Sequence, residues 1–268
     1  MQASTVLSNS ALTGKKSCST NLTRLLLIRI FFRIDMMSAS YAQTKPSLPI
    51  EGVASMTSQH NPSLPLAETG FACLLNISSR SSTIIKGLQE LVSLTTDIRD
   101  LGYETPSQAE LYSFTGRRTY TEWGLSTIEP SFEIKLEAAI KSCCRLSAQI
   151  YVNIVLRKME VRYAVLPYLA NKLKNTLDQT DVDVMWEDKA ELLTWVLFQG
   201  GVVATEEGIR KWYVSYLVFC SKHLGLQTWN DVVELLGKFL WVSLELEKHC
   251  KALWYEIVVG LSDFETSE

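Results

Sequence analysis

The stretch ELLTWVLFQGGVVATEEGIRKWYVSYL, from Glu191 to Leu217, places two adjacent glycines between two apolar and aromatic runs. Nearly every residue from Leu192 to Phe198 is apolar, which is typical of a helix that is buried on most sides. A glycine that follows a helix commonly supplies the left-handed residue that ends it. The sequence therefore predicts that Gly200 and Gly201 form a corner between two packed helices.

The segment after the glycines carries the signals of a second helix. Thr205 offers a side-chain oxygen as an N-cap, and Glu206 and Glu207 follow where the helix dipole favours acidic side chains. Apolar residues then recur at helical spacing: Ile209, Trp212, Tyr213, Tyr216, Leu217 and Cys220. No strand pattern precedes the glycines, and their spacing matches neither a dinucleotide fingerprint nor a phosphate loop. We therefore interpret the stretch as structural rather than ligand-binding.

The same helical period continues along most of the chain. Amphipathic runs predict further helices from residue 81 onward, over 131–159, over 166–177, after residue 228 and over 245–259. Pro106 after Thr105, and Thr228 three residues before Asp231, are signals of helix starts. No segment alternates strongly enough to seed a sheet. The sequence predicts an all-α fold, an irregular helical bundle with a disordered N-terminal segment.

Composition places limits on the class of protein. The chain has 268 residues, of which 47% are hydrophobic, so a sizeable core can form. Its six cysteines include no Cys-x-x-Cys pair, which argues against a disulfide scaffold or a paired metal framework and indicates reduced thiols. Cys143 and Cys144 fall within a predicted helix, where we interpret them as small buried hydrophobes rather than a redox pair.

The charge is distributed unevenly. The formal net charge is −3, whereas residues 178–268 carry 16 acidic and 7 basic residues, a balance of −9, which leaves +6 on the rest of the chain. Affinity for duplexes is built from Lys and Arg side chains that neutralise phosphates. Nucleic-acid contact by the acidic part is therefore disfavoured.

The first 70 residues differ from the remainder. The first acidic residue is Asp35, and the run LTRLLLIRIFFRI before it spaces arginines along apolar residues. No uninterrupted apolar span of about 20 residues is present, so no membrane span is predicted. The composition fits a mitochondrial transit peptide, and it also fits a non-native leader with initiation at Met36 or Met37. Residues 38–68, rich in Ser, Pro, Thr and Gln, have the composition of a linker.

Residues that could carry chemistry are few. His60 lies in the linker, whereas Cys220, His223, His249 and Cys250 could be imagined as a Cys2His2 site. Neighbouring residues of a helix point about 100° apart, so His249 and Cys250 can hardly converge on one ion. No nucleophile or zinc-hydrolase motif is present. We predict no catalytic residue, no cofactor, no metal site and no enzyme activity.

Two polar segments could bind a ligand or could be ordinary solvated residues. In SFTGRRTY, Arg117 and Arg118 lie among aromatic residues, a combination that can bind an anion or single-stranded nucleic acid. Binding footprints usually gather more charge, so we interpret the pair as solvated residues of a loop. DQTDVDVMWED, residues 178–188, is interpreted as a polar hinge, because the glycine and the later glutamate of a calcium loop are absent.

Several segments together resemble one family. ELLTWVLFQGGVVA, IRKWYVSYL, LGLQTWNDVVELLGKFLW and CKALWYEIV, in this order, resemble the end of the fungal-specific transcription factor domain, and KSCCRLSAQIYVNIVLR, Lys141–Arg157, is similar to one of its earlier helices. The resemblance covers residues 81–259. Its landmarks are structural: Trp195, Gly200, Gly201, Trp212, Trp229, Trp241 and Trp254.

The resemblance implies an all-helical regulatory region. In that family the region usually follows a Zn2Cys6 DNA-binding cluster that begins with Cys-x-x-Cys, whereas the cysteines here are scattered from Cys18 to Cys250. The resemblance therefore implies a nuclear protein that acts through protein partners, a homodimer or a small ligand, without direct contact to nucleic acid. Two alternatives remain open: a mitochondrial small-molecule-binding protein or enzyme with a cleaved leader, and a stable fold without further function.

These observations predict three parts of the chain. Residues 1–70 form a disordered leader and a Ser/Pro-rich linker, residues 71–260 form the helical transcription factor-like domain, and residues 261–268 form an acidic tail.

Overall fold

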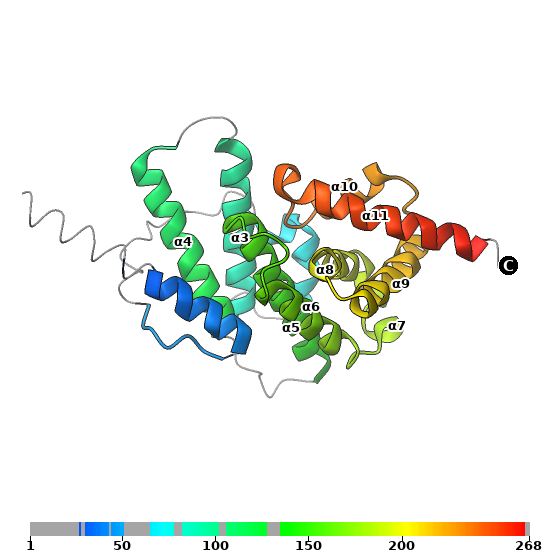
Figure 1. Cartoon of the computed structure of the whole chain (residues 1–268), viewed down its shortest axis with the longest axis horizontal. Helices are drawn as coiled ribbons and strands as arrows, with labels where there is room; N and C mark the ends of the chain where they lie inside the picture. Colours follow the sequence, from blue (N-terminus) through cyan, green and yellow to red (C-terminus); the bar gives the residue numbers. More distant parts are fainter. Residues whose placement is uncertain are drawn as a thin grey trace, which may run out of the picture.

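The structure is a computed structural model that describes residues 27, 30–42, 44–50, 65–77, 82–101, 106–127 and 135–265. Every regular element within these ranges is a helix (Figure 1), which confirms the predicted all-α fold. Most of the predicted disordered segment lies outside the described residues. Among the helices that the structure describes, none combines the length and the hydropathy needed to cross a bilayer.

The described helices follow one another with short connections. In chain order they are a helix at 30–42, the 3₁₀ helices η1 (Leu66–Glu68) and η2 (Gly70–Asn76), α3 (Thr83–Leu101), α4 (Gln108–Ser126), α5 (Lys135–Tyr151), the π-helix η3 (Val152–Leu156), α6 (Val165–Leu177), α7 (Val182–Met185), the 3₁₀ helix η4 (Glu187–Lys189), α8 (Ala190–Val203), α9 (Glu207–Leu224), α10 (Trp229–Gly237) and α11 (Ser243–Glu265). We refer to the first of them as helix 30–42.

Helix α8 lies at the centre of this arrangement. Every residue from Leu192 to Val203 is buried, and α8 contacts α5, α6, α9, α10 and α11. A helix that is apolar on all sides is stable only when other elements enclose it. The apolar run from Leu192 to Phe198 is therefore part of a buried helix, as predicted, and this helix lies at the centre of the bundle.

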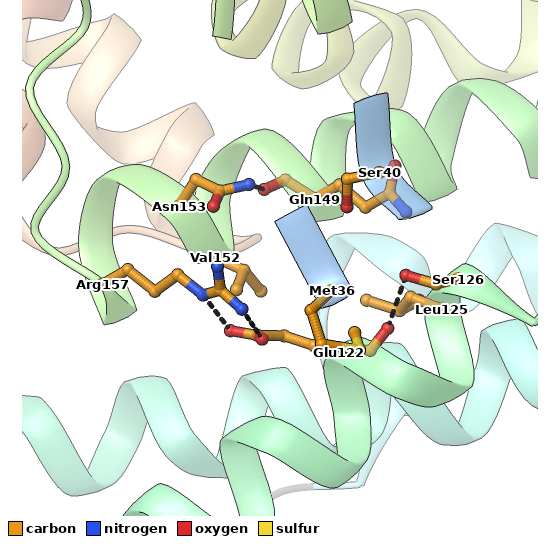
Figure 2. A pocket seen from close by; sticks show the side chains of 9 residues that line it. All are labelled: Met36, Ser40, Glu122, Leu125, Ser126, Gln149, Val152, Asn153 and Arg157. Carbon is orange, nitrogen blue, oxygen red and sulfur yellow. Dashed lines mark hydrogen bonds and ion pairs between the residues drawn. The ribbon is translucent and has the colours of Figure 1, made fainter. Parts of the chain in front are cut away.

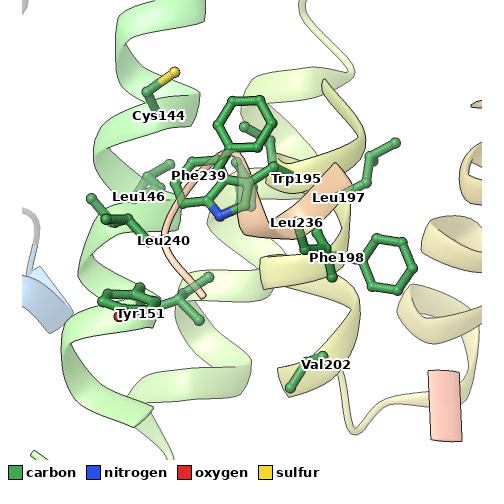
Figure 3. Close-up of a cluster of buried hydrophobic side chains, with 14 of the residues drawn as sticks. Cys144, Leu146, Tyr151, Trp195, Leu197, Phe198, Val202, Leu236, Phe239 and Leu240 are labelled. Carbon is green, nitrogen blue, oxygen red and sulfur yellow. The ribbon is translucent and has the colours of Figure 1, made fainter. Parts of the chain in front are cut away.

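An aromatic cluster lies within this core. The Trp195 ring stacks on Phe239 with 5.7 Å between the ring centroids, and Phe71 packs edge-on against both rings at 5.1 Å. Figure 3 shows Trp195 and Phe239 beside residues of α5, including Cys144 and Leu146. Such pairs add stability beyond the apolar area that they bury. Through Phe71 the cluster also fixes η2 to the helical body.

The predicted corner at Gly200 and Gly201 is wrong. Both glycines lie inside α8, which continues to Val203, and the chain turns at Ala204 and Thr205 before α9. A Cβ built on Gly200 would stand 2.3 Å from the hydroxyl oxygen of Tyr213. The glycine is required because the α9 tyrosine approaches the α8 backbone closely, not because the helix ends there. The N-cap of α9 is Glu206 rather than Thr205.

Some of the other observed helix boundaries agree with the predicted ones, and others differ. The capping box predicted at Thr228 and Asp231 is present, with Asp231 N–H donating to Thr228 Oγ1 at 3.3 Å. Helix α4 begins later than the Pro106 signal, because Ser107 is the N-cap and pairs with Glu110. The predicted polar hinge at 178–188 contains α7 and the buried Trp186. Helix α11 extends to residue 265, into the predicted acidic tail.

Helix 30–42 was not anticipated by the sequence analysis, which assigned these residues to a leader and a linker. Its inward face buries Phe32, Met36, Ala39 and Ser40, and the ring of Tyr41 lies 4.4 Å from the ring of Tyr168 in α6. In Figure 1 the helix lies beside α4 at the edge of the bundle. The described part of the N-terminal region therefore packs against the helical body.

Substitution of Gly200 tests the close approach of α8 and α9. Gly200→Ala should displace Tyr213 and weaken the 2.7 Å hydrogen bond that its hydroxyl donates to Ala170 O. We expect the free energy of unfolding to fall by about 2–4 kcal/mol. Gly208→Ala is the matched control, because a Cβ there meets nothing within 4 Å, and it should be neutral or slightly stabilising. Urea unfolding of both variants measures the difference, and equal stabilities would contradict the packing argument.

Candidate functional site

A small cavity lies between helix 30–42, α4 and the end of α5 (Figure 2). Its volume is about 10 Å³, close to the least that admits one water molecule. Six of its nine lining residues are polar, although it lies among packed helices. It is lined by Met36, Ser40, Glu122, Leu125, Ser126, Gln149, Val152, Asn153 and Arg157.

A buried ion pair forms one side of the cavity. Arg157 donates to Glu122 through two nitrogens: Nε lies 2.8 Å from Oε1, and Nη2 makes a short contact with Oε2. Arg118, one turn before Glu122, places its Nε 3.7 Å from the same carboxylate and donates from Nη1 to Leu156 O at 2.9 Å. Two guanidinium groups thus share one carboxylate. Such bidentate geometry fixes orientation as well as charge.

The π-helix η3 gives Arg157 its position. Asn153 Nδ2 donates to Gln149 O at 2.8 Å, and the wide turn closes with Arg157 N–H donating to Val152 O at 2.9 Å. Lys158 follows with a positive φ of 52°. Isolated π-helical turns commonly mark functional positions. Here the wider turn directs the Arg157 guanidinium toward α4.

Gln149 lines the cavity, and no described residue bonds to its side chain. The residue is only 4% exposed, and neither its Oε1 nor its Nε2 makes a hydrogen bond to the part of the chain that the structure describes. A buried polar group left unsatisfied costs roughly 1–3 kcal/mol, and native proteins contain few of them. Gln149 is therefore the residue of this site that packing alone does not explain.

The arrangement favours positioning over catalysis. The Glu122 carboxylate is engaged by Arg157 and Arg118. The cavity volume of about 10 Å³ is far below the roughly 300–1,000 Å³ of small-molecule sites. As it stands, the site connects helix 30–42 to α4 and α5 through a polar layer. None of its residues was predicted as a site residue.

The predicted loop at Arg117 and Arg118 is wrong, because both residues lie within α4. Arg117 is 6% exposed and is held between α3 and α4. It donates to Glu90 at 2.5 Å, to Asp97 at 2.6 Å and to Ser93 at 2.8 Å. Its charge is therefore neutralised inside the fold, and it presents no surface to a phosphate.

The structural landmarks are distributed through the body. Trp195 and Trp254 are buried, whereas Trp212 is half-buried, with Lys174 5.1 Å above its ring. Trp229 and Trp241 pack edge to face, with ring centroids 6.2 Å apart. These positions, together with Gly200 and Gly201 inside α8, lie in and around the core rather than at the polar cavity.

The cysteines and histidines do not converge on a metal. Within the described ranges, no three or more His, Cys, Asp or Glu side chains are grouped so that they could hold an ion. Cys143 and Cys144 are buried, as predicted. Burial raises the pKa of the Cys220 thiol to about 11 and also raises the pKa of Cys250. Both thiols stay protonated near neutral pH. His60 lies outside the described residues.

Removal of the buried carboxylate tests the ion pair. Glu122→Gln leaves the Arg157 guanidinium buried without a counter-charge, so we expect the free energy of unfolding to fall by about 3 kcal/mol. Glu207→Gln removes an exposed carboxylate that pairs with Lys211 and should leave stability unchanged. Thermal unfolding of the two variants compares them. If both variants lost the same stability, the buried ion pair of Glu122 would contribute no more than the exposed pair of Glu207.

Replacement of the Gln149 amide, in contrast, should make the protein more stable. Gln149→Met keeps the length of the side chain and removes two unsatisfied atoms, so we expect unfolding to require about 1–2 kcal/mol more. Asn153→Leu is the matched control on the next turn, because it loses the hydrogen bond to Gln149 O and should be destabilising. Chemical denaturation measures both changes. A destabilised Gln149→Met variant would mean that the amide is satisfied in solution.

Comparison with known proteins assigns the chain to a family. The chain matches the fungal specific transcription factor domain over residues 1–234, whereas no curated protein and no solved structure matches it. The matched range starts earlier than the resemblance at 81–259, so it includes helix 30–42, and it ends within α10, before Trp241 and Trp254. Since the match covers well over half of the sequence, the chain belongs to the fungal specific transcription factor domain family.

Proposed function

We propose that this chain is the helical regulatory region of a transcription factor-like protein, without a zinc cluster of its own, and that it acts in the nucleus through protein partners. Membership of the family supports a regulatory role of this kind. The sequence contains no Cys-x-x-Cys pair with which such a cluster would begin. Recognition of DNA would then come from outside this stretch of sequence.

The small volume of the cavity is the reason to propose that the chain binds protein partners rather than a small ligand. At about 10 Å³ it has no room for an organic molecule of ordinary size. Large apolar side chains, in contrast, stand on the surface, among them Phe31, Phe219 and Leu244. These side chains are available for contact with another protein, whereas the cavity offers no room for a ligand.

A tethering experiment tests the regulatory role. The full chain is fused to a heterologous DNA-binding domain in yeast, and expression of a reporter with the matching operator is measured. We expect expression to change several-fold relative to the DNA-binding domain alone. Trp195→Ala, which removes the centre of the aromatic cluster and should unfold the domain, is expected to abolish the change, whereas Glu207→Gln should retain it.

Two results would contradict the proposal. A folded and nuclear fusion that leaves the reporter unchanged would argue against a regulatory role. A C-terminally tagged chain that resides in mitochondria and has lost its N-terminal segment would instead support the organellar alternative, which rests on the Arg-rich and acid-poor composition of the first 34 residues.

A further inference from the structure

We propose that the outward face of α11 binds an amphipathic helix of another protein, one that brings acidic side chains to Lys248 and Lys251. The inference deepens the proposed function, on which it rests for a partner that is a protein, and it names the surface and the chemistry of that partner. Helix α11 follows the residues that match the family, 1–234.

Helix α11 packs against α8, α9 and η3 with one of its faces. This inward face buries Leu246, Cys250, Leu253 and Ile257, which lie four, three and four residues apart. In Figure 1 the helix runs along the edge of the body, and its C-terminal part extends beyond α9. The opposite face of α11 is therefore turned to solvent.

The outward face repeats the spacing of the inward one over more than two heptads. Its members lie alternately four and three residues apart, which places them in one line along the helix: Leu244, Lys248, Lys251, Tyr255, Val258 and Ser262. We refer to these six residues as the α11 seam. Leu244 is 89% exposed, Tyr255 61% and Val258 40%. Exposed apolar side chains with this period are what one helix offers to another in a coiled coil.

The two lysines in the middle of the α11 seam determine what can bind there. Neither Lys248 nor Lys251 makes an ion pair with any residue that the structure describes. Four other basic residues of the C-terminal part each pair with a carboxylate: Lys189, Arg210, Lys211 and Lys238. The α11 seam thus presents two positive charges, with apolar side chains on both sides of them, that a partner can neutralise.

The nearest carboxylates along the helix are engaged by other groups. Glu245 pairs with Lys158 at 3.1 Å. Glu247 lies one turn before Lys251, but it accepts a hydrogen bond from the hydroxyl of Ser243. The negative charge opposite the two lysines must therefore come from the partner.

A single acidic helix is the occupant that fits these charges. The α11 seam contains no acidic residue, so a second copy paired through the same seam would supply no negative charge to the lysines. A flat anionic surface, such as a membrane or a duplex, would also meet other carboxylates, since residues 178–268 carry 16 acidic and 7 basic residues, a balance of −9. A helix about 10 Å wide contacts the seam alone, and charges farther away than roughly 8–10 Å are screened.

Fluorescence anisotropy with the full chain and two labelled peptides tests the α11 seam. The acidic peptide is a helix of about three heptads whose own seam reads Leu-Leu-Glu-Glu-Leu-Leu, an order that is the same in both directions, so that either orientation can pair. The basic peptide has Lys in place of both Glu. We expect the acidic peptide to bind with a dissociation constant on the order of 10 µM, the basic peptide to bind at least about tenfold more weakly, and added salt to weaken the acidic complex.

Reversal of the charges on α11 gives a second readout. The double substitution Lys248→Glu and Lys251→Glu should invert the preference, so that the basic peptide binds more tightly. Lys172→Glu makes the same change at an exposed lysine of α6 and should keep the preference of the parent chain. Tyr255→Ala removes an aromatic anchor and should weaken binding of the acidic peptide about tenfold. Circular dichroism checks that each variant keeps its helix content.

Three results would overturn the proposed partner: equal affinity for the two peptides, a double variant that keeps the parent's preference, or binding of the acidic peptide that Tyr255→Ala leaves unchanged. A dimer of the parent chain in sedimentation that Tyr255→Ala dissociates would overturn it in favour of a second copy. None of these results changes the reporter measurement of the regulatory role. A silent reporter together with intact peptide binding would instead contradict the regulatory role alone.

Discussion

Helix α8 has no polar face, and this constrains the whole body. Because each of its residues from Leu192 to Val203 is buried, its neighbours must bring apolar stripes to it from several directions. Helices α5, α6, α9, α10 and α11 do so, and the ring of Trp195 extends the same core to η2 through Phe71. The contact between α8 and α9 is so close that Gly200 has no room for a side chain beside Tyr213.

Helix α4 is attached to this body in a different way. Its buried residues include two charged ones, Arg117 and Glu122. Arg117 connects α4 to α3 through Glu90 and Asp97, while Glu122 connects it to η3 through Arg157. Buried ion pairs contribute less net stability than apolar side chains of the same size, but loss of one partner is strongly destabilising. The position of α4 therefore depends on matched charges.

This difference explains what the sequence could predict. The amphipathic period of α6 and the capping box at Thr228 are local signals, and both led to correct helices. The polar inward face of α4 resembles a solvated surface, so the sequence placed Arg117 in a loop. The glycines of α8 read as a helix end because the ring that approaches Gly200 comes from another helix.

The candidate site had no sequence signal, since its side chains come from four separate elements: helix 30–42, α4, α5 and η3.

The same contrast distinguishes helix 30–42 from the enclosed body. Helix 30–42 rests on the polar layer around Glu122 and Gln149, and its buried side chains lie apart from the main apolar core, which begins at Leu66. The position of helix 30–42 therefore depends, like that of α4, on polar groups as well as on apolar contacts such as the one between Tyr41 and Tyr168. The body around α8, in contrast, is held together by apolar packing from several directions.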